Sequence, residues 1–367
     1  MKENNALVKN IRIITGALIV AGIVFVVLGA RSNEPSRMWQ IYLVNFLLWT
    51  GVAQAGAIFS AVLEITNARW GSRMRSVAES LVSFLPVSIV LLLIMIIGSP
   101  HIFPWISKVE IPAAKQIYLN LPFLYGRNLL GMGLLTFLSI VFINKRRSAD
   151  TGLIERPRKF AVVLLILYAV IYTFVAFDFI MSLSPHWYST IMGMHFFTAC
   201  FYTGLSVILM SAVFGRWHLF PADFMRDKDF HDLGKLLFGF AIFWMSLVWS
   251  QFLVIWYGNM PEETEFLHLR FYEHPWQTMT WSFIILGFFV PLIILLNKKG
   301  KTNQIVSSIV ATLILLGSFV HLYVLVVPSI TPHHLYIGIQ EFAVSLGFIG
   351  LFILSHDVGL KYWPIPD

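Results

Sequence analysis

The fold class follows from stretches such as residues 160–183, which read FAVVLLILYAVIYTFVAFDFIMSL. Asp178 is the only charged residue in this stretch, and about 20 mostly apolar residues suffice for a helix to cross a bilayer. The whole chain of 367 residues has the same character, because 57% of its residues are hydrophobic and only 12% are charged. A soluble domain has about 25% charged residues. This composition excludes a soluble enzyme, a disordered protein and a nucleic-acid-binding module.

Ten stretches of this kind predict an all-α integral membrane protein with ten transmembrane helices, forming one polytopic membrane domain over residues 1–367. The first stretch is long and is not followed by a clear small-residue cleavage site, which favours a retained helix over a signal peptide. The ten stretches cover approximately residues 13–30, 38–63, 77–97, 121–143, 160–183, 190–214, 236–256, 276–296, 305–327 and 335–354.

The distribution of basic residues predicts the orientation of the helices. Of the 26 Lys and Arg residues, 20 lie on the side of the N-terminus and Arg127 lies within a stretch. Cytoplasmic loops are enriched in Lys and Arg, so we expect both termini to be cytoplasmic. The formal charge of +7 therefore indicates topology and no nucleic-acid partner. The other side carries five basic residues, Arg31, Arg37, Lys108, Lys115 and Arg270.

A repeated dipeptide suggests that the chain contains two copies of a four-helix unit. Arg69-Trp70 and Arg216-Trp217 follow two of the stretches and lie 147 residues apart, and internal repeats are common in membrane proteins. We expect the first four-helix bundle to cover residues 38–159 with its last helix at 160–183. The second bundle is expected at residues 190–327, and the helices at 13–30 and 335–354 flank the two bundles.

Ionisable residues within the stretches cluster at one depth. Charges inside a membrane are costly and usually have a partner or a function. At a rise of about 1.5 Å per residue, the group lies roughly 8–10 Å below the outer boundary. We interpret it as an outer polar site able to bind or pass protons. Its members are Arg127, Asp178, His195, His321 and Glu341, and Asn45 falls in the same layer.

A second polar group lies near the cytoplasmic side and comprises Gln54, Glu64 and Glu79. Two polar layers separated by an apolar middle suggest two proton half-channels, or one half-channel and a binding site. The alternatives are plainer. Arg127 and Asp178 lie at matching depth on consecutive antiparallel helices, which also suits a structural ion pair. Glu79 begins a helix, where a carboxylate favours the N-terminal dipole, so it also suits a plain interfacial residue. Glu64 stands at a helix end and suits the interface as well.

The sequence offers few residues that could hold a metal or a redox cofactor. Cys200 is the single cysteine, which excludes a disulfide framework and thiolate-ligated clusters. His195 and His321 are either packing residues or a pair of axial ligands for haem b, since they share one depth. The adjacent His333 and His334 lack a third ligand, so we predict no metal site.

The outer loop at residues 256–276 is acidic and aromatic. It holds Glu262, Glu263, Glu265 and Glu273 against a single Arg270. We interpret it as a docking surface for a partner protein, and a solvated loop that merely avoids positive charge is the alternative.

Two long segments resemble the NrfD/polysulfide reductase-type membrane subunits and, more narrowly, the ActF subunits of alternative complex III, a quinol:cytochrome c oxidoreductase. They are residues 176–190, AFDFIMSLSPHWYST, and residues 249–264, WSQFLVIWYGNMPEET. Softer similarity lies in 115–123, KQIYLNLPF, followed by Arg127, and in Arg69-Trp-Gly leading to Arg73, Arg75 and Glu79. The resemblance runs from about residue 39 to residue 354.

The resemblance implies a subunit of the bacterial inner membrane with several partners. These are an iron–sulfur/molybdopterin-like subunit, multihaem cytochrome c subunits, a paralogous ten-helix subunit and, as a further partner, a cytochrome oxidase. Haem c and the iron–sulfur clusters are then expected in the partners, with no redox cofactor in this chain and menaquinol or ubiquinol bound nearby.

Related subunits often bind quinol with a histidine on the first helix of the first bundle, whereas this chain has Asn45 and Gln54 there. That difference favours a supporting or proton-conducting role, with Asp178, Arg127, His195, His321 and Glu341 at an outer site. Glu79 and Glu64 would then line a cytoplasmic entry.

Two other functions stay open on the sequence alone. The chain could bind quinol itself, through His195, Asp178 and Asn45. A secondary transporter is the alternative from another class, and it predicts helices broken near Pro86 and Pro291.

Overall fold

The computed structural model describes residues 5–106, 111, 113–150, 152, 155–221 and 224–365. The described part is all-helical, with no strand. Ten of its helical segments are long and apolar enough to cross a membrane, which confirms the predicted fold class. The chain is a multi-pass membrane protein. Lys2 and Lys108, which entered the count of basic residues, lie outside the described residues.

The ten spans include three in which the winding changes along one continuous segment. The spans are α1 (Asn5–Ala30), α2 (Pro35–Ile65), α3–η1–α4 (Ser72–Leu81, Val82–Phe84, Leu85–Ile102), α5 (Leu121–Asp150), α6 with η4 (Arg158–Phe179, Met181–Leu183), α7 (Met192–His218), α8 (Asp227–Gly258), α10–η5–α11 (Trp276–Ile284, Ile285–Phe289, Val290–Leu296), α13 (Gln304–Ile330) and α14 (Ile339–Tyr362). Short helices connect them: η2 (Pro104–Ile106), η3 (Ala113–Lys115), α9 (Pro261–Phe271) and α12 (Lys298–Thr302).

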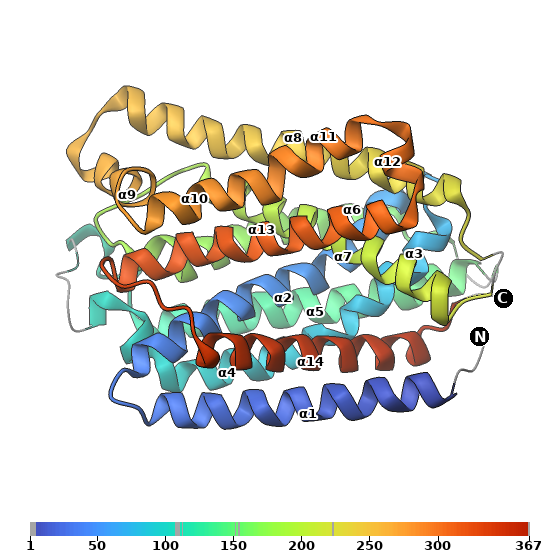
Figure 1. Ribbon diagram of the computed structural model, residues 1–367, viewed down its shortest axis with the longest axis horizontal. Coiled ribbons are helices and arrows are strands. Elements are labelled where there is room, and N and C mark those ends of the chain that lie inside the picture. The colour runs from blue at the N-terminus through green and yellow to red at the C-terminus, as the bar shows by residue number, and fades with distance from the viewer. Residues whose placement is uncertain are drawn as a thin grey trace.

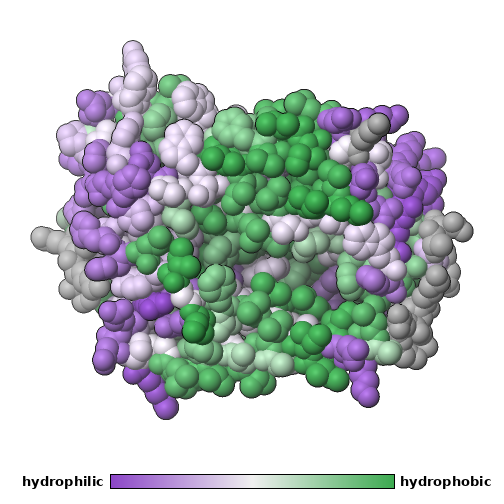
Figure 2. All heavy atoms as spheres, in the orientation of Figure 1, coloured by the Kyte–Doolittle hydropathy of each residue, from purple (hydrophilic) through white to green (hydrophobic). Residues whose placement is uncertain are grey.

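The spans lie side by side along the long axis, and both termini lie at the same end (Figure 1). We call this end the terminal end, and the opposite end, which carries α9, the distal end. A hydrophobic belt crosses the middle of the visible face, and hydrophilic residues gather at both ends (Figure 2). Lipid-facing residues such as Ile13, Val20 and Leu130 are exposed, as a bilayer allows.

The centre of the protein is formed by α2 and α7. Every residue from Met38 to Ala61 is buried, and so is every residue from Thr198 to Leu209. The two helices approach closely, because a Cβ atom added at Gly204 would lie 2.1 Å from the Cβ of Ala55. Small residues permit such contacts between membrane helices. Because α2, α7 and α13 all pack on one another, the grouping into two four-helix bundles stays a prediction.

Three prolines inside or at the start of helices leave a carbonyl four residues earlier without its usual N–H donor. In each case a side chain donates instead, as the absence of water in a bilayer requires. Both spans singled out for breaks, at Pro86 and Pro291, continue without an unwound segment. The substitute donors are Ser99 Oγ to Ile96 O at 2.8 Å, Tyr202 Oη to Gly287 O at 2.9 Å and Arg270 Nε to Val324 O at 2.9 Å, for Pro100, Pro291 and Pro328 respectively.

Candidate functional site

Asp178 on α6 and Arg127 on α5 form a buried ion pair near the distal end. Arg127 Nε donates to Asp178 Oδ2 at 2.7 Å, and its Nη2 donates to Oδ1. Asn128 Nδ2 donates to the same carboxylate at 2.5 Å, and Asp178 is completely buried. The carboxylate is thus bound on both oxygens, in the ion pair that equal depth on neighbouring helices suggested.

The guanidinium of Arg127 is held on its other sides as well. Its Nη1 donates to the carbonyl of Tyr118 at 3.2 Å. The rings of Tyr118 and Phe123 face it at 3.7 and 4.5 Å from their centroids, in cation–π contact. A relay through Asp178 would have to break this arrangement.

Glu341 and Asn45 connect α14 to α2. Arg37 on α2 donates to both carboxylate oxygens of Glu341, at 2.5 and 2.7 Å. Asn45 Nδ2 donates to Ile41 O and to Ser345 Oγ, both at 2.9 Å. These two members of the predicted outer layer are therefore engaged in contacts between helices.

His195 on α7 and His321 on α13 are brought together, with ring centroids 4.9 Å apart. Both are buried, and they line a cavity of about 40 Å³ together with Gln251. Within the described part of the chain, neither ring nitrogen of His195 forms a hydrogen bond of good geometry, and Gln251 Oε1 forms none either, although the amide of Gln251 lies near the His195 ring. Most of the surface that lines the cavity is apolar. Its volume suffices for about three water molecules, which would need polar partners such as the free atoms of His195 and Gln251.

The histidine cavity shares lining residues with a neighbouring cavity on each side. Towards the distal end, Phe266, Leu267 and Arg270 line both this cavity and a cleft of about 820 Å³. Towards the middle of the protein, His321 also lines a smaller cavity beside Thr203. Thr203 Oγ1 donates to Ser318 Oγ at 2.7 Å there. Polar groups therefore extend from the distal cleft into the interior.

Arg270 lies at the neck between the cleft and the cavity, and the sequence counted it only as a basic loop residue. It is buried on α9, and it donates to three backbone carbonyls and one hydroxyl. Burial lowers the pKa of its guanidinium to about 9. Pro328, which frees one of these carbonyls, was the signal that could have revealed this role. The acceptors are Val324 O at 2.9 Å, Leu325 O and Phe266 O at 3.0 Å, and Ser329 Oγ at 2.7 Å.

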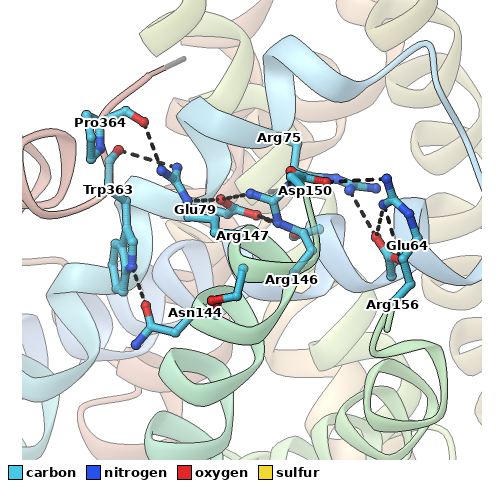
Figure 3. Close-up of polar contacts among 12 residues, drawn as sticks. Glu64, Arg75, Glu79, Asn144, Arg146, Arg147, Asp150, Arg156, Trp363 and Pro364 are labelled. Atoms are coloured by element: carbon cyan, nitrogen blue, oxygen red, sulfur yellow. Dashed lines mark hydrogen bonds and ion pairs between the residues drawn. The ribbon is translucent and has the colours of Figure 1, made fainter. Parts of the chain in front are cut away.

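Glu79 lies in a network of arginines at the terminal end (Figure 3). Arg146 Nη2 and Arg147 Nε donate to Glu79 Oε2 at 2.9 and 2.8 Å, and Ser60 Oγ donates to Oε1 at 2.8 Å. The carboxylate of Glu79 is completely buried. Sequence reasoning used these arginines for topology and missed them as partners.

Glu64 belongs to the same network. Arg75 Nη1 donates to its Oε2 at 3.1 Å, and Arg156 Nη1 lies 3.3 Å from the same oxygen. Gln54, predicted in the same layer, donates from Nε2 to Ser139 Oγ at 3.0 Å. Both predicted entry carboxylates are thus paired with arginines.

Comparison with known protein families shows to which family the chain belongs. A family model described as polysulphide reductase, NrfD, matches residues 29–332. The chain belongs to the NrfD family. The matched region reaches from the end of α1 to the loop after α13, so it includes both polar regions and excludes Glu341. No curated protein matches the chain.

Membership of the NrfD family establishes a coarse function. NrfD proteins are membrane subunits of quinol-linked redox complexes, and they partner with iron–sulfur/molybdopterin-type subunits. The chain is therefore assigned to this class of membrane subunit.

The acidic loop of this NrfD chain lies at the distal cleft. Glu262, Glu265 and Glu273 line the cleft, while Glu263 lies in the first turn of α9. Arg270 is buried and turned away from them, and His268 Nδ1 lies 3.1 Å from Glu273 Oε1. The loop therefore presents a more acidic surface than its composition suggests. Its role as a docking surface stays a prediction.

The remaining residues that were considered as metal or cofactor ligands do not come together in the structure. Among the described residues, no group of three or more His, Cys, Asp or Glu could hold a metal ion. His333 and His334 are exposed in the loop before α14. Cys200 is a buried thiol that faces Gly51 at the crossing of α7 and α2.

Proposed function

We propose that the chain is the ActF-like membrane subunit of an alternative complex III-type quinol:cytochrome c oxidoreductase, and that it conducts protons. It would lie in a bacterial inner membrane with both termini cytoplasmic. The family match supports the quinol-linked class, and the segments 176–190 and 249–264 support the narrower assignment. Proton conduction is supported mainly by the histidine cavity. Several of its buried polar atoms have no hydrogen-bond partner of good geometry, and the cavity adjoins the distal cleft.

In this proposal His195 and His321 carry the proton. A neutral imidazole accepts a proton at one nitrogen and can release one from the other, and water in the cavity would connect the pair with the cleft. Arg270 shapes the neck, because its donors are engaged with carbonyls and a hydroxyl.

The four candidate carboxylates are all paired with arginines, so we do not assign them the role of proton carriers. Asp178, Glu341, Glu79 and Glu64 would each have to leave an arginine before carrying a proton, and breaking a buried pair is costly. We assign Arg127–Asp178 and Arg37–Glu341 to holding helices together. Any proton entry at Glu64 and Glu79 would involve opening their network.

Quinol binding by this chain is less well supported. An apolar ring the size of benzene occupies a cavity of about 150 Å³, whereas the cavity at His195 measures about 40 Å³. Asp178 and Asn45 already have hydrogen-bond partners. We propose that a neighbouring subunit binds menaquinol or ubiquinol.

A haem between His195 and His321 fits poorly, because a porphyrin is far larger than a cavity of about 40 Å³. We therefore propose that this chain holds no redox cofactor, and that haem c and iron–sulfur clusters lie in its partners.

The complex assignment predicts which proteins accompany the chain. Purification of the native complex in mild detergent is expected to retain multihaem cytochrome c subunits, an iron–sulfur/molybdopterin-like subunit and a second ten-helix subunit. Mass spectrometry and haem absorbance would identify them. Copurification with an iron–sulfur subunit alone would keep the family function and contradict the alternative complex III type.

The proton assignment predicts the effect of His195→Gln in the assembled complex. Loss of the imidazole is expected to slow transfer through the cavity by about 100-fold, which would lower proton release per electron during quinol oxidation in liposomes. His356→Gln is the matched control, because His356 lies on α14 near the terminal end and bonds to Ser80. Normal assembly with unchanged proton release in His195→Gln would overturn the assignment.

A further inference from the structure

A second large pocket opens at the terminal end between α2, α3 and α5. It measures about 760 Å³ and is lined by five arginines. We propose that this pocket binds a phosphate group, supplied by the headgroup of an anionic phospholipid. The lining arginines are Arg69, Arg75, Arg146, Arg147 and Arg156.

The charges around the pocket do not balance. Its lining contains two carboxylates, Glu64 and Asp150, and Glu79 behind them is shared by Arg146 and Arg147. Five cations therefore face three anions in a partly desolvated site. Figure 3 shows four of the arginines with the three carboxylates. Like charges held together in this way are unfavourable, and a bound dianion or two monoanionic phosphates would offset the excess.

One arginine of the pocket is available for a ligand. The side chain of Arg69 is exposed, and none of the described residues forms an ion pair or hydrogen bond with it. Arginine is well suited to phosphate, because its planar N–H groups match two phosphate oxygens. The other four hold fixed positions through Glu64, Glu79 and Asp150, so the site is already formed.

The start of α3 adds a second source of attraction for an anion. Gly71 is its N-cap and supplies no side-chain cap. Among the first three N–H groups of α3, that of Ser72 donates to Arg69 O at 3.5 Å, and no acceptor among the described residues is found for the next two. Ser72 and Ser76, on the first two turns, line the pocket. Free N–H groups at a helix N-terminus favour phosphate. Arginines, helix end and hydroxyls therefore converge on one cavity.

The position of the pocket favours a lipid as the source of the phosphate. The pocket lies where α2, α3 and α5 leave the hydrophobic belt, which is the level of phospholipid headgroups. Leu63 and Ala68 line it together with the charged residues, and they offer apolar contact to the glycerol and upper acyl carbons. Basic pockets between membrane helices bind such headgroups.

The proposal is tested on the delipidated complex in detergent, by adding cardiolipin, phosphatidylglycerol, phosphatidylethanolamine or inorganic phosphate. Ligands that bind the folded state raise the midpoint of thermal unfolding. Cardiolipin and phosphatidylglycerol are expected to raise it at lower concentration than phosphatidylethanolamine. Arg69→Gln is expected to weaken this response about five-fold.

Two further variants separate the site from general charge effects. Ser72→Asp places a negative charge in the pocket, yet an acidic residue in the first turn favours a helix. We expect it to fold and to lose the response to anionic lipid. Arg226→Gln removes another exposed arginine from the same end, outside the pocket, and should respond like the unmodified chain.

The outcomes distinguish the two sources of phosphate. A response to inorganic phosphate that exceeds the lipid response, and that Arg69→Gln weakens, would keep the phosphate site and overturn the lipid as its source. Equal responses to all lipids, or unchanged responses in both Arg69→Gln and Ser72→Asp, would overturn the proposal. These readouts are independent of the function proposed for the histidine cavity.

Discussion

Replacing Arg127 with methionine is expected to destabilise the protein by about 3–5 kcal/mol. Methionine fills much of the same volume, but it leaves the carboxylate of Asp178 completely buried without its cation. Asn128 would remain as a donor, and one neutral amide does not compensate a buried charge. The free energy of unfolding of the detergent-solubilised protein, measured by denaturant titration, would report the loss.

Two further variants separate the charge from the packing. Arg127→Met combined with Asp178→Asn removes both charges, and replacing a buried pair as a whole is often close to neutral. We expect the double variant to recover most of the lost stability. Arg12→Gln is the exposed counterpart, because Arg12 pairs with Asp357 at 3.0 Å with 43% of its side chain exposed, and it should cost less than about 1 kcal/mol. A double variant as unstable as the single one would show that packing, and not charge, holds the site.

The Arg127–Asp178 pair also shows what could be predicted from the sequence. The helical rise gives the depth of each residue within its span, and two opposite charges at one depth on consecutive helices can meet. The same arithmetic placed His195 and His321 in one layer, and the structure shows their rings 4.9 Å apart. The number of transmembrane helices could be predicted from hydrophobicity alone.

The rotation of each helix about its axis could not be predicted. Amphipathic patterns reveal which face is buried, but α2 and α7 are buried on all sides at their centres and carry no such pattern. The direction of His195 depends on the rotation of α7, and the contribution of Gln251 to the histidine cavity depends on the rotation of α8. Arg270 was missed for a different reason, because its partners are backbone carbonyls, which leave no charge pattern in the sequence.

Glu79 accepts hydrogen bonds from two arginines and one serine, which makes it the centre of the terminal-end network. Glu79→Gln is expected to destabilise the protein by about 3 kcal/mol or more, since the amide leaves Arg146 and Arg147 with less negative charge in a buried place. Arg147 also donates to the carbonyl of Pro364 at 2.8 Å. The segment after α14 should therefore loosen and become more sensitive to protease.

The same variant discriminates between a structural network and a proton entry. A carboxylate that only carries protons could be replaced by Gln with normal stability and reduced proton release, whereas the centre of an ion network cannot. Glu79→Asp keeps the charge but shortens the side chain, so it should retain more stability than Glu79→Gln. Denaturant titration and proteolysis of residues after Tyr362, beside proton release in liposomes, separate the two roles. Unchanged stability with lost proton release would place Glu79 on the proton path, because only a group that is free to leave its arginines can move a proton without weakening the fold.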